Sequence, residues 1–289
     1  MKKKLLLIIA ICLLTLTTGC TKDNMEDIEI ITTSYAIEYI TERLYGDHAL
    51  INSVYPDGTD IRNYEVTKKQ LNDYSKKELF IYNGLGNDSN IATKLLEKNK
   101  DLKIIDSSFG MELTYPNKPE ELWLNPSQLL MMAQNIRKGL NEYINSTYLQ
   151  KEIDEVYEEL KVELSELDAE IKLTAENSIN KTLVVSNNSL KFLEKYGFTV
   201  ISLEEDGMLL DKTINDVKAM INNNQISYIF VLEYEQINST IQNIINETSV
   251  ETLTFRRLDN ITDLERDNQD NYVTIMNKNI DLLKQELYR

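Results

Sequence analysis

The sequence predicts an α/β protein of two lobes, each built on a roughly four-stranded, mostly parallel sheet with flanking helices, and joined by one long rigid linking helix. Three observations predict this fold. Short apolar runs alternate with amphipathic stretches across residues 28–143, the same alternation returns across 182–287, and the segment 149–177 between them has the period of a single helix. Alternating strands and helices favour parallel sheets that are covered by helices on both faces.

The first half contains four apolar runs of strand length, separated by stretches with helical periodicity. Pro56-Asp57-Gly58 ends the second run with a turn signal, and Pro126 stands in the first turn of the last helical stretch, where its missing N–H is tolerated. These elements form a predicted N-terminal lobe of residues 28–147. We expect its strands at 28–33, 49–55, 79–82 and 103–106, and its helices at 35–44, 66–75, 90–98 and 126–143.

The segment that follows predicts a strut. From Leu149 to Ile171 apolar residues recur every three or four positions, and neither Gly nor Pro occurs up to Asn177. This pattern predicts a helix of about 27 residues and roughly 40 Å, which is too short for a sustained coiled coil. We therefore expect a linking helix within residues 148–178 that lies along a globular body.

The second half repeats the alternation and forms a predicted C-terminal lobe of residues 179–289. A cleft between the two lobes, at the carboxyl ends of their strands, is the expected ligand site. We expect strands at 182–185, 199–203, 226–232 and 251–255, and helices at 189–196, 212–222, 237–246 and 271–287.

The first twenty residues have the pattern of a bacterial export signal: three lysines, an apolar run from Leu5 to Leu16, and a Gly19-Cys20 ending that resembles a lipobox. The apolar run is too short to remain a spanning helix. We expect a signal peptide of residues 1–19, lipid on Cys20 and a polar tether at 20–27. The protein would then be extracytoplasmic, anchored to the outer face of the cell membrane. Ordinary cleavage without lipid is the alternative.

The composition excludes several classes of function. The net charge of −16 becomes −19 once the signal lysines are removed, which argues against nucleic acid as a partner, because phosphate binding needs clustered Lys and Arg. The single histidine, His48, argues against a His-built metal site and a Ser-His-Asp set, and its place before a strand indicates a surface turn. No HExxH, CxxC, GxSxG or Gly-rich phosphate loop occurs. We expect no enzyme, and an exported hydrolase is the least favoured alternative.

Several strings, in order and spacing, resemble the zinc/manganese solute-binding lipoproteins of bacterial metal ABC importers, some of which are described as adhesin lipoproteins. The resemblance covers about residues 28–289 and includes the long helix. The strings are Ile31-Thr32-Thr33-Ser34-Tyr35, Gly46-Asp47-His48-Ala49, Tyr55-Pro56-Asp57-Gly58-Thr59-Asp60-Ile61-Arg62-Asn63-Tyr64-Glu65, Leu79-Phe80-Ile81-Tyr82-Asn83-Gly84, Leu122-Trp123-Leu124-Asn125-Pro126, Tyr228-Ile229-Phe230-Val231 and Asn271-Tyr272-Val273-Thr274-Ile275-Met276.

The resemblance implies a metal held between the lobes, but this sequence departs from the family at the metal ligands. The family's set of His, His, His or Glu, and Asp or Glu corresponds here to Arg62, Glu121, Asn187 and Asp259. Glu121 and Asp259 are the candidate metal ligands, and Asn187 could offer a carbonyl oxygen. Arg62 is a permanent cation and cannot coordinate a metal.

This substitution suggests that the guanidinium of Arg62 stands where the metal would sit, within ion-pair reach of Glu121 or Asp259. In that case no divalent ion binds. Glu233, which ends a predicted buried strand, is a further candidate for the cleft, and Trp123 is expected in the core or at a helix entry.

The function implied by the resemblance is that of a lipid-anchored substrate-binding protein of a zinc- or manganese-type ABC importer. It would bind its solute or metal ion in the interlobe cleft and deliver it to a membrane permease, and we expect it to act as a monomer. The alternative is a family member that has lost metal binding and serves as a surface adhesion or interaction protein, or binds another solute.

Overall fold

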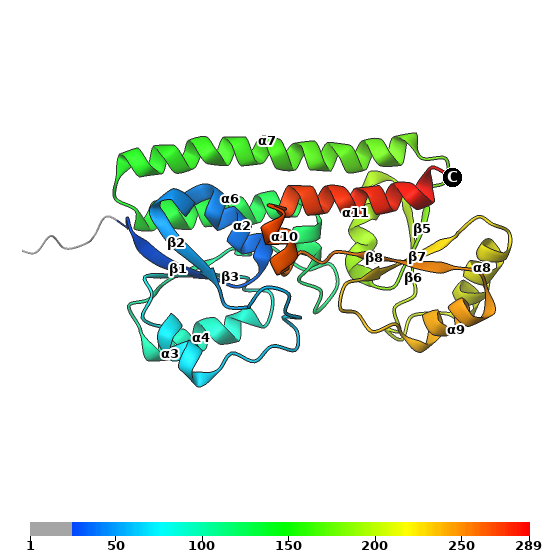
Figure 1. Cartoon of the computed structure of the whole chain (residues 1–289), viewed down its shortest axis with the longest axis horizontal. Helices are drawn as coiled ribbons and strands as arrows, with labels where there is room; N and C mark the ends of the chain where they lie inside the picture. Colours follow the sequence, from blue (N-terminus) through cyan, green and yellow to red (C-terminus); the bar gives the residue numbers. More distant parts are fainter. Residues whose placement is uncertain (1–24) are drawn as a thin grey trace, which may run out of the picture.

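The computed structural model describes residues 25–289 and confirms the predicted two-lobe α/β fold (Figure 1). The predicted signal peptide and the Cys20 lipidation site lie outside the described residues. Each lobe contains four parallel strands, in the orders β2-β1-β3-β4 and β6-β5-β7-β8. The two lobes therefore share one topology, in which the strand order reverses beside the first strand and leaves a crevice at the carboxyl ends.

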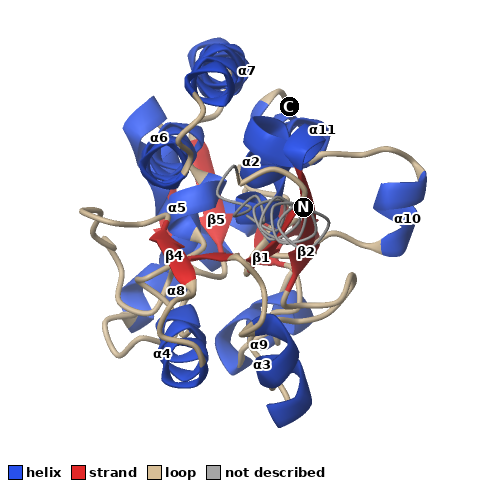
Figure 2. Cartoon of the chain, turned by 90° about the vertical axis from the view of Figure 1, so that its left-hand side faces the viewer, coloured by secondary structure: helices blue, strands red, loops and turns tan. Residues whose placement is uncertain are grey.

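The N-terminal lobe has its strands at β1 (Ile28–Thr32), β2 (Ala49–Ser53), β3 (Leu79–Tyr82) and β4 (Lys103–Asp106). The central strands β1 and β3 are almost wholly buried, as continuous apolar runs in a parallel sheet require. Helices lie on both faces of the sheets (Figure 2). Those of this lobe are α2 (Tyr35–Tyr45), α3 (Lys68–Tyr74), α4 (Asp88–Lys98), α5 (Glu121–Leu124) and α6 (Pro126–Tyr143), with a short turn η2 (Gly46–His48).

The C-terminal lobe has its strands at β5 (Thr182–Val185), β6 (Thr199–Ser202), β7 (Tyr228–Leu232) and β8 (Glu251–Phe255). The stretch predicted as a helix at 189–196 is a 3₁₀ helix instead, η3 (Asn188–Tyr196), which begins at the Asn187 cap and ends at Gly197 with φ 96°. The remaining helices are α8 (Asp211–Asn222), α9 (Ser239–Glu247), α10 (Asp263–Asp267) and α11 (Tyr272–Leu287).

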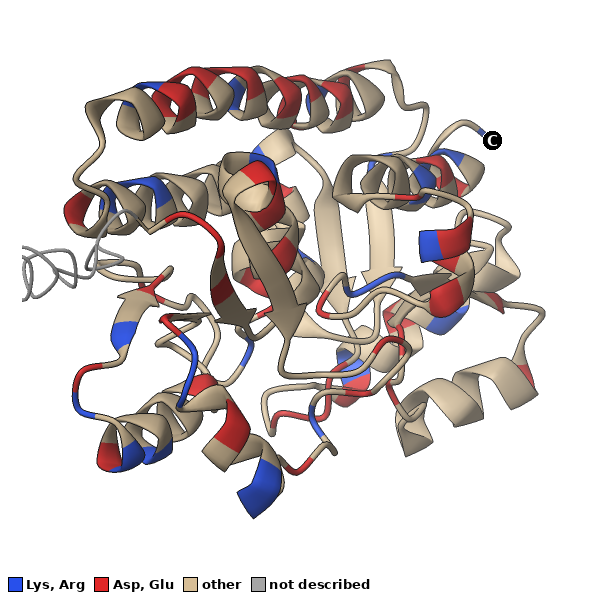
Figure 3. Cartoon of the chain, turned by 60° about the vertical axis from the view of Figure 1, so that its left-hand side comes forward, with Lys and Arg blue, Asp and Glu red and all other residues tan. Residues whose placement is uncertain are grey.

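The strut is α7 (Thr147–Asn177), a helix of 31 residues that is about 46 Å long at 1.5 Å per residue. It begins two residues before the predicted Leu149, because the Ser146 hydroxyl caps it by accepting from the Leu149 N–H. Its apolar stripe packs on α6, α11 and α2, and acidic residues line its outer side (Figure 3). The helix therefore spans both lobes with one buried face.

Three short helices were not predicted from the sequence: η2, α5 and α10. α10 is only five residues long and is held by a capping box between Thr262 and Glu265. Such single turns lack the length over which a periodic pattern can be recognised. No helix within residues 25–289 is long and apolar enough to cross a membrane.

The segment between β8 and α11 crosses from the C-terminal lobe and docks on the N-terminal lobe. The Tyr35 N–H donates to the carbonyl of Asp259 at 2.9 Å, and the Gly58 N–H donates to that of Ile261 at 2.8 Å. Asn260 also donates to the Pro56 carbonyl at 2.9 Å. These bonds fix residues 259–261 against the mouth of the crevice.

Candidate functional site

The cleft lies where the carboxyl ends of the two sheets approach one another. A cavity of about 310 Å³ is lined by the loops after β2 and β3 and the segment before α5 from one lobe, and by residues after β5 and β8 from the other. Both lobes contribute charged and amide side chains, so a solute held here would contact both. The lining residues that carry the argument are Arg62, Asn83, Asp88, Glu120, Asn187 and Arg257.

Arg62 lines this cavity, but its ion-pair partner is not the one expected. Its Nε donates to Asp60 Oδ1 at 3.0 Å, and its Nη2 donates to the carbonyl oxygen of Tyr234 at 2.5 Å. No ion pair within residues 25–289 joins Arg62 to Glu121 or Asp259. Asp60 pairs with the Arg62 guanidinium because the two residues are only two positions apart in one loop. Bringing such close neighbours together costs little chain entropy. Arg62 thereby bridges the lobes at the rim of the cleft.

Glu121 faces away from the cleft cavity, and the preceding residue, Glu120, lines it. Glu121 is the first residue of α5 and accepts hydrogen bonds from the backbone N–H groups of Thr114 and Tyr115. Glu120 is buried and accepts from the Ser189 hydroxyl at 2.8 Å, across the lobe boundary. Consecutive residues of a helical turn point about 100° apart. Of this Glu-Glu pair, Glu120 lines the cavity that also contains Arg62 and Asn187, and Glu121 does not.

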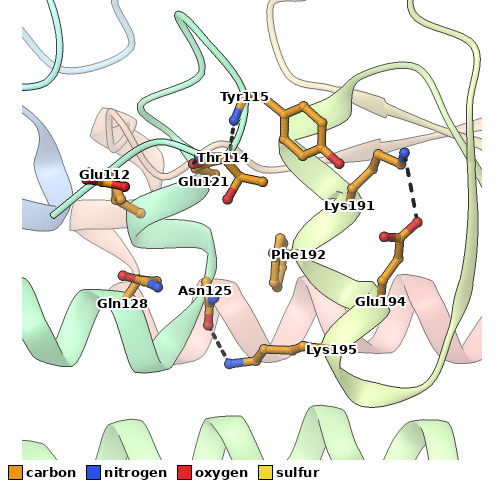
Figure 4. A pocket seen from close by; sticks show the side chains of 11 residues that line it. Glu112, Thr114, Tyr115, Glu121, Asn125, Gln128, Lys191, Phe192, Glu194 and Lys195 are labelled. Atoms are coloured by element: carbon orange, nitrogen blue, oxygen red, sulfur yellow. Dashed lines mark hydrogen bonds and ion pairs between the residues drawn. The ribbon is translucent and has the colours of Figure 1, made fainter.

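A second cavity, of about 280 Å³, contains the Glu121 side chain (Figure 4). It also lies between the lobes, with Tyr115 and Gln128 on one side and Lys191 and Lys195 of η3 on the other. Burial raises the pKa of Glu121, and the hydrogen bonds from the Thr114 and Tyr115 N–H groups oppose that rise. The Glu121 carboxylate thus stabilises the 112–115 loop by accepting hydrogen bonds from its backbone.

Asp259 lies beside the cleft, as expected, but its partner is Arg257. Arg257 Nη2 is 2.8 Å from Asp259 Oδ2, and the two side chains are 3% and 0% exposed. Burial raises the pKa of Asp259 to about 6, against the opposing effect of the Arg257 charge. Sequence reasoning missed Arg257. The available signal was its place two residues after strand β8, at a sheet's carboxyl end.

Asn187 lines the cavity, but its carbonyl oxygen is already used. That oxygen accepts from both the N–H and the hydroxyl of Ser189, at 2.9 and 2.8 Å, because Asn187 caps η3. Its amide donates to Glu235 Oε1 at 3.0 Å. Asn187 is therefore a structural cap of the cleft wall, and its carbonyl oxygen is not free to coordinate a cation.

Glu233 and His48 lie outside the cleft cavity. Glu233 forms an ion pair with Arg256, which precedes Arg257 at the end of β8. Glu233 therefore lies on the opposite side of the β8 end from the cleft cavity. His48 lies in η2, 3.3 Å from Glu152 of the strut, in agreement with a role away from the site. Trp123 is buried, as expected for a core residue.

The donor set does not fit a zinc or manganese ion. In the part of the chain that the structure describes, no three His, Cys, Asp or Glu side chains are grouped so that they could hold a metal. Two buried carboxylates, Asp88 and Glu120, line the cleft cavity, and a third, Asp259, lies beside it with the Arg257 guanidinium bound to it. Zinc sites need three or four such ligands, and a fixed guanidinium cannot serve as one.

Two parallel α/β lobes, one helical strut and a polar cavity between the carboxyl ends of both sheets define the class of helix-linked two-lobe binding proteins. Residues 30–286 match the family model of ZnuA, zinc-uptake complex component A periplasmic, and the chain belongs to that family.

Two curated relatives illustrate the family. The zinc-binding lipoprotein AdcA of Streptococcus pneumoniae strain R6 is 24% identical, with 99% of this chain and 61% of AdcA aligned. The manganese ABC transporter substrate-binding lipoprotein PsaA of Streptococcus pneumoniae serotype 4 is 25% identical, with 91% of this chain and 90% of PsaA aligned. The chain thus spans about three fifths of AdcA and nearly the whole of PsaA.

Solved structures share the fold. The Zn(II)-bound ZnuA-like domain of Streptococcus pneumoniae AdcA superimposes with a TM-score of 0.73 at 21% identity, over 91% of this chain and 100% of that domain. The laminin-binding protein Lmb of Streptococcus agalactiae, described as bifunctional with adhesin and metal transporting activity, gives 0.72 at 15% identity, over 90% and 99%. At these identities the likeness establishes the two-lobe fold.

Proposed function

We propose that the chain is the extracytoplasmic solute-binding component of an ABC importer of the zinc/manganese type. The observation that carries this proposal is the cleft cavity, which is lined by charged and amide groups from both lobes. A solute held there would join the lobes, and a permease could recognise the joined form. Family membership and the names of AdcA and PsaA support the assignment.

We propose that lipid on Cys20 anchors the protein to the outer face of the membrane, where it works as a monomer beside its permease. The lipobox-like Gly19-Cys20 ending and the lipoprotein names of both relatives support this. One lipid chain gives only marginal membrane binding, whereas a multiply acylated cysteine holds stably.

The experiment is capture of the permease from intact cells. The tagged full-length chain is cross-linked in its own host, and the covalent complexes are identified by mass spectrometry. We expect ABC permease subunits to be enriched over those captured by an unrelated lipoprotein, and we expect Cys20→Ala to release the chain from the membrane. The absence of any permease subunit from the cross-linked material would overturn the proposal.

The cargo needs a separate measurement, because the donor set disagrees with a directly coordinated metal ion. Chelator-stripped protein is melted with and without Zn²⁺ or Mn²⁺. A ligand at 100 times its Kd stabilises by about 2.7 kcal/mol, which raises Tm by roughly 5–10 °C in a chain of this size. We expect no shift. A shift that is lost in Asp259→Asn would instead make the metal the cargo.

A surface interaction role is the second candidate, and the substituted ligand positions Arg62 and Asn187 favour it. The description of Lmb as an adhesin adds support. Saturable binding of the soluble mature chain to immobilised laminin, together with failure to capture a permease, would select this role over transport.

A further inference from the structure

We infer that Arg257 supplies, from within the chain, the positive charge that a bound metal would otherwise bring to the cleft, and that it closes the Glu120 and Asp259 carboxylates to divalent cations. Arg257 is thus a residue that determines specificity by exclusion. The inference rests on the proposed function for the location of the site. It deepens that function because it names divalent cations as a class of solute that the site does not bind.

The first step is the ion pair itself. Arg257 Nη2 lies 2.8 Å from Asp259 Oδ2, with both side chains almost fully buried. Among the described residues, Arg257 is the one cation within ion-pair distance of Asp259, and neither carboxylate oxygen has a hydrogen bond of good geometry. A buried carboxylate without a counter-charge is strongly unfavourable, so Asp259 depends on Arg257 or on another cation in its place.

The second step is the neighbouring carboxylate. Glu120 is 5% exposed and lines the same cavity as Arg257. Its negative charge opposes ionisation of Asp259. Two carboxylates in one buried cleft repel each other unless a cation lies near both. A metal ion or an arginine can meet that need, and this chain contains the arginine.

The third step is that Arg257 is held in place. Its carbonyl oxygen accepts from the indole Nε1 of Trp123 at 2.8 Å, across the lobe boundary. Trp123 is itself buried, and its own carbonyl accepts from the Tyr272 hydroxyl at 2.5 Å. The Arg257 backbone is thus tied to the N-terminal lobe through Trp123, and the ion pair with Asp259 holds the guanidinium beside that carboxylate.

The fourth step is the chemistry of the guanidinium. It remains protonated in proteins and has no lone pair to offer, so a divalent ion would meet a fixed positive charge in a low-dielectric cleft. Replacing it with a short neutral side chain would leave two carboxylates facing an open space. Oxygen donors of that kind suit Mn²⁺.

The test is metal binding by the mature chain with Cys20→Ser and no lipid. Manganese binding is followed by calorimetry and by the loss of the free Mn²⁺ signal in electron paramagnetic resonance. We expect the native chain to bind Mn²⁺ with a Kd above about 1 mM, and Arg257→Ser to bind one ion at least about tenfold more tightly. The gain should disappear when Glu120→Gln is added to Arg257→Ser.

The matched control is Arg256→Ser, because Arg256 precedes Arg257 in sequence but pairs with Glu233 and Glu265 outside the cavity. It should bind Mn²⁺ no better than the native chain. Arg257→Lys keeps the charge and should also leave the site closed. Circular dichroism and melting verify that each variant folds, and Arg257→Gln replaces Arg257→Ser if the serine variant does not.

Two results overturn the inference. One is tight 1:1 binding of Mn²⁺ or Zn²⁺ by the native chain that is lost in Asp259→Asn, a measurement that needs no Arg257 variant. The other is a folded Arg257→Ser or Arg257→Gln chain that gains no metal affinity. Neither result touches the permease capture, so failure of the inference and failure of the proposed function are distinguishable.

Discussion

The indole Nε1 of Trp123 donates to the backbone carbonyl of Arg257 at 2.8 Å, and this bond joins α5 of the N-terminal lobe to the strand end that carries the cleft arginine. It is a fully buried contact between lobes. The single tryptophan of the chain therefore holds the two halves in register at the floor of the cleft.

Trp123→Phe should remove this hydrogen bond while keeping an aromatic ring in the core. The Arg257 carbonyl would then be buried without its donor, which costs about 1–3 kcal/mol, and the smaller ring adds a packing loss. We expect the free energy of unfolding to fall by about 2–4 kcal/mol, measured by urea denaturation followed by circular dichroism. Tyr148→Phe, at a position 71% exposed, is the control and should change it by less than about 0.5 kcal/mol.

Arg62→Ala should loosen the rim of the cleft and leave global stability nearly unchanged. The side chain is 41% exposed, so its pair with Asp60 is screened by solvent. What is lost is its bond to the Tyr234 carbonyl on the other lobe. We expect faster amide hydrogen exchange in residues 56–62 and 233–236, with less than about 1 kcal/mol of destabilisation. The control is Lys76→Ala, which removes a local ion pair with Asp73 at the end of α3. It should leave amide hydrogen exchange in both segments unchanged.

Lys195→Met should weaken the junction of three elements. The Lys195 ammonium donates to Asn125 at 2.7 Å (Figure 4). It also donates to Ser127 at 2.7 Å and to Asp168 of the strut at 2.9 Å, so it ties η3 to α6 and α7. Because the side chain is about one-third exposed, we expect a loss of about 1 kcal/mol in thermal or urea unfolding.

Lys191→Met is the matched control for this change. Lys191 is on the same helix and in the same cavity, but its ion pair is with Glu194, at 4.0 Å in its own element. Its contact with the other lobe is a cation–π approach to the Tyr115 ring at 5.6 Å rather than a hydrogen bond. An equal loss of stability in the two variants would contradict the bridging role of Lys195.

Glu38 should make the protein less stable as the pH rises. It is 4% exposed, and burial raises its pKa from 4.5 to about 7, against the opposing effect of the Arg266 charge; Glu42 and Asp57 face the same side chain. Between these two pKa values the folded chain retains a proton that the unfolded chain has lost. Stability from this group is therefore fully present at and below pH 4.5 and is lost as the pH rises through about 7.

The size of this effect is bounded by the shift. At about 1.4 kcal/mol per pKa unit, the loss of stability reaches at most about 3.5 kcal/mol. The measurement is the free energy of unfolding from pH 5 to 8 in the native chain and in Glu38→Gln, which cannot ionise. The difference between them should shrink as the pH falls, whereas parallel curves would count against the raised pKa. Asp73→Asn, at an exposed pair with Lys76, is the control for general charge effects.

The fold followed from the sequence because its signals are long and periodic. Apolar runs such as Ile28–Thr32 and Tyr228–Leu232 are buried on both faces, and the stripe along α7 repeats over 31 residues. The strand at 251–255 and the helix at 126–143 were predicted with their observed bounds. The single-turn helices α5 and α10 were missed because four or five residues carry no period.

The site followed from the sequence only in part. The loop ends that form the cleft could be predicted, and Arg62, Asn187 and the neighbourhood of Asp259 do lie there. The choice between Glu120 and Glu121 could not, since it depends on the rotation of one short helical turn. Nor could the partner of Asp259, because two adjacent arginines at the end of β8 point to opposite sides of the strand end.

The sequence by itself determined two parallel α/β lobes, their linking helix and the absence of a histidine-rich metal site. Those features depend on residue type and on periods of two or 3.6 residues, which are properties of the local chain. Only the tertiary structure decided that Arg257, and not Arg62, forms the ion pair with Asp259. That outcome depends on which side chains from residues far apart in sequence meet in a buried space, where a carboxylate needs a counter-charge and the nearest fixed cation provides it.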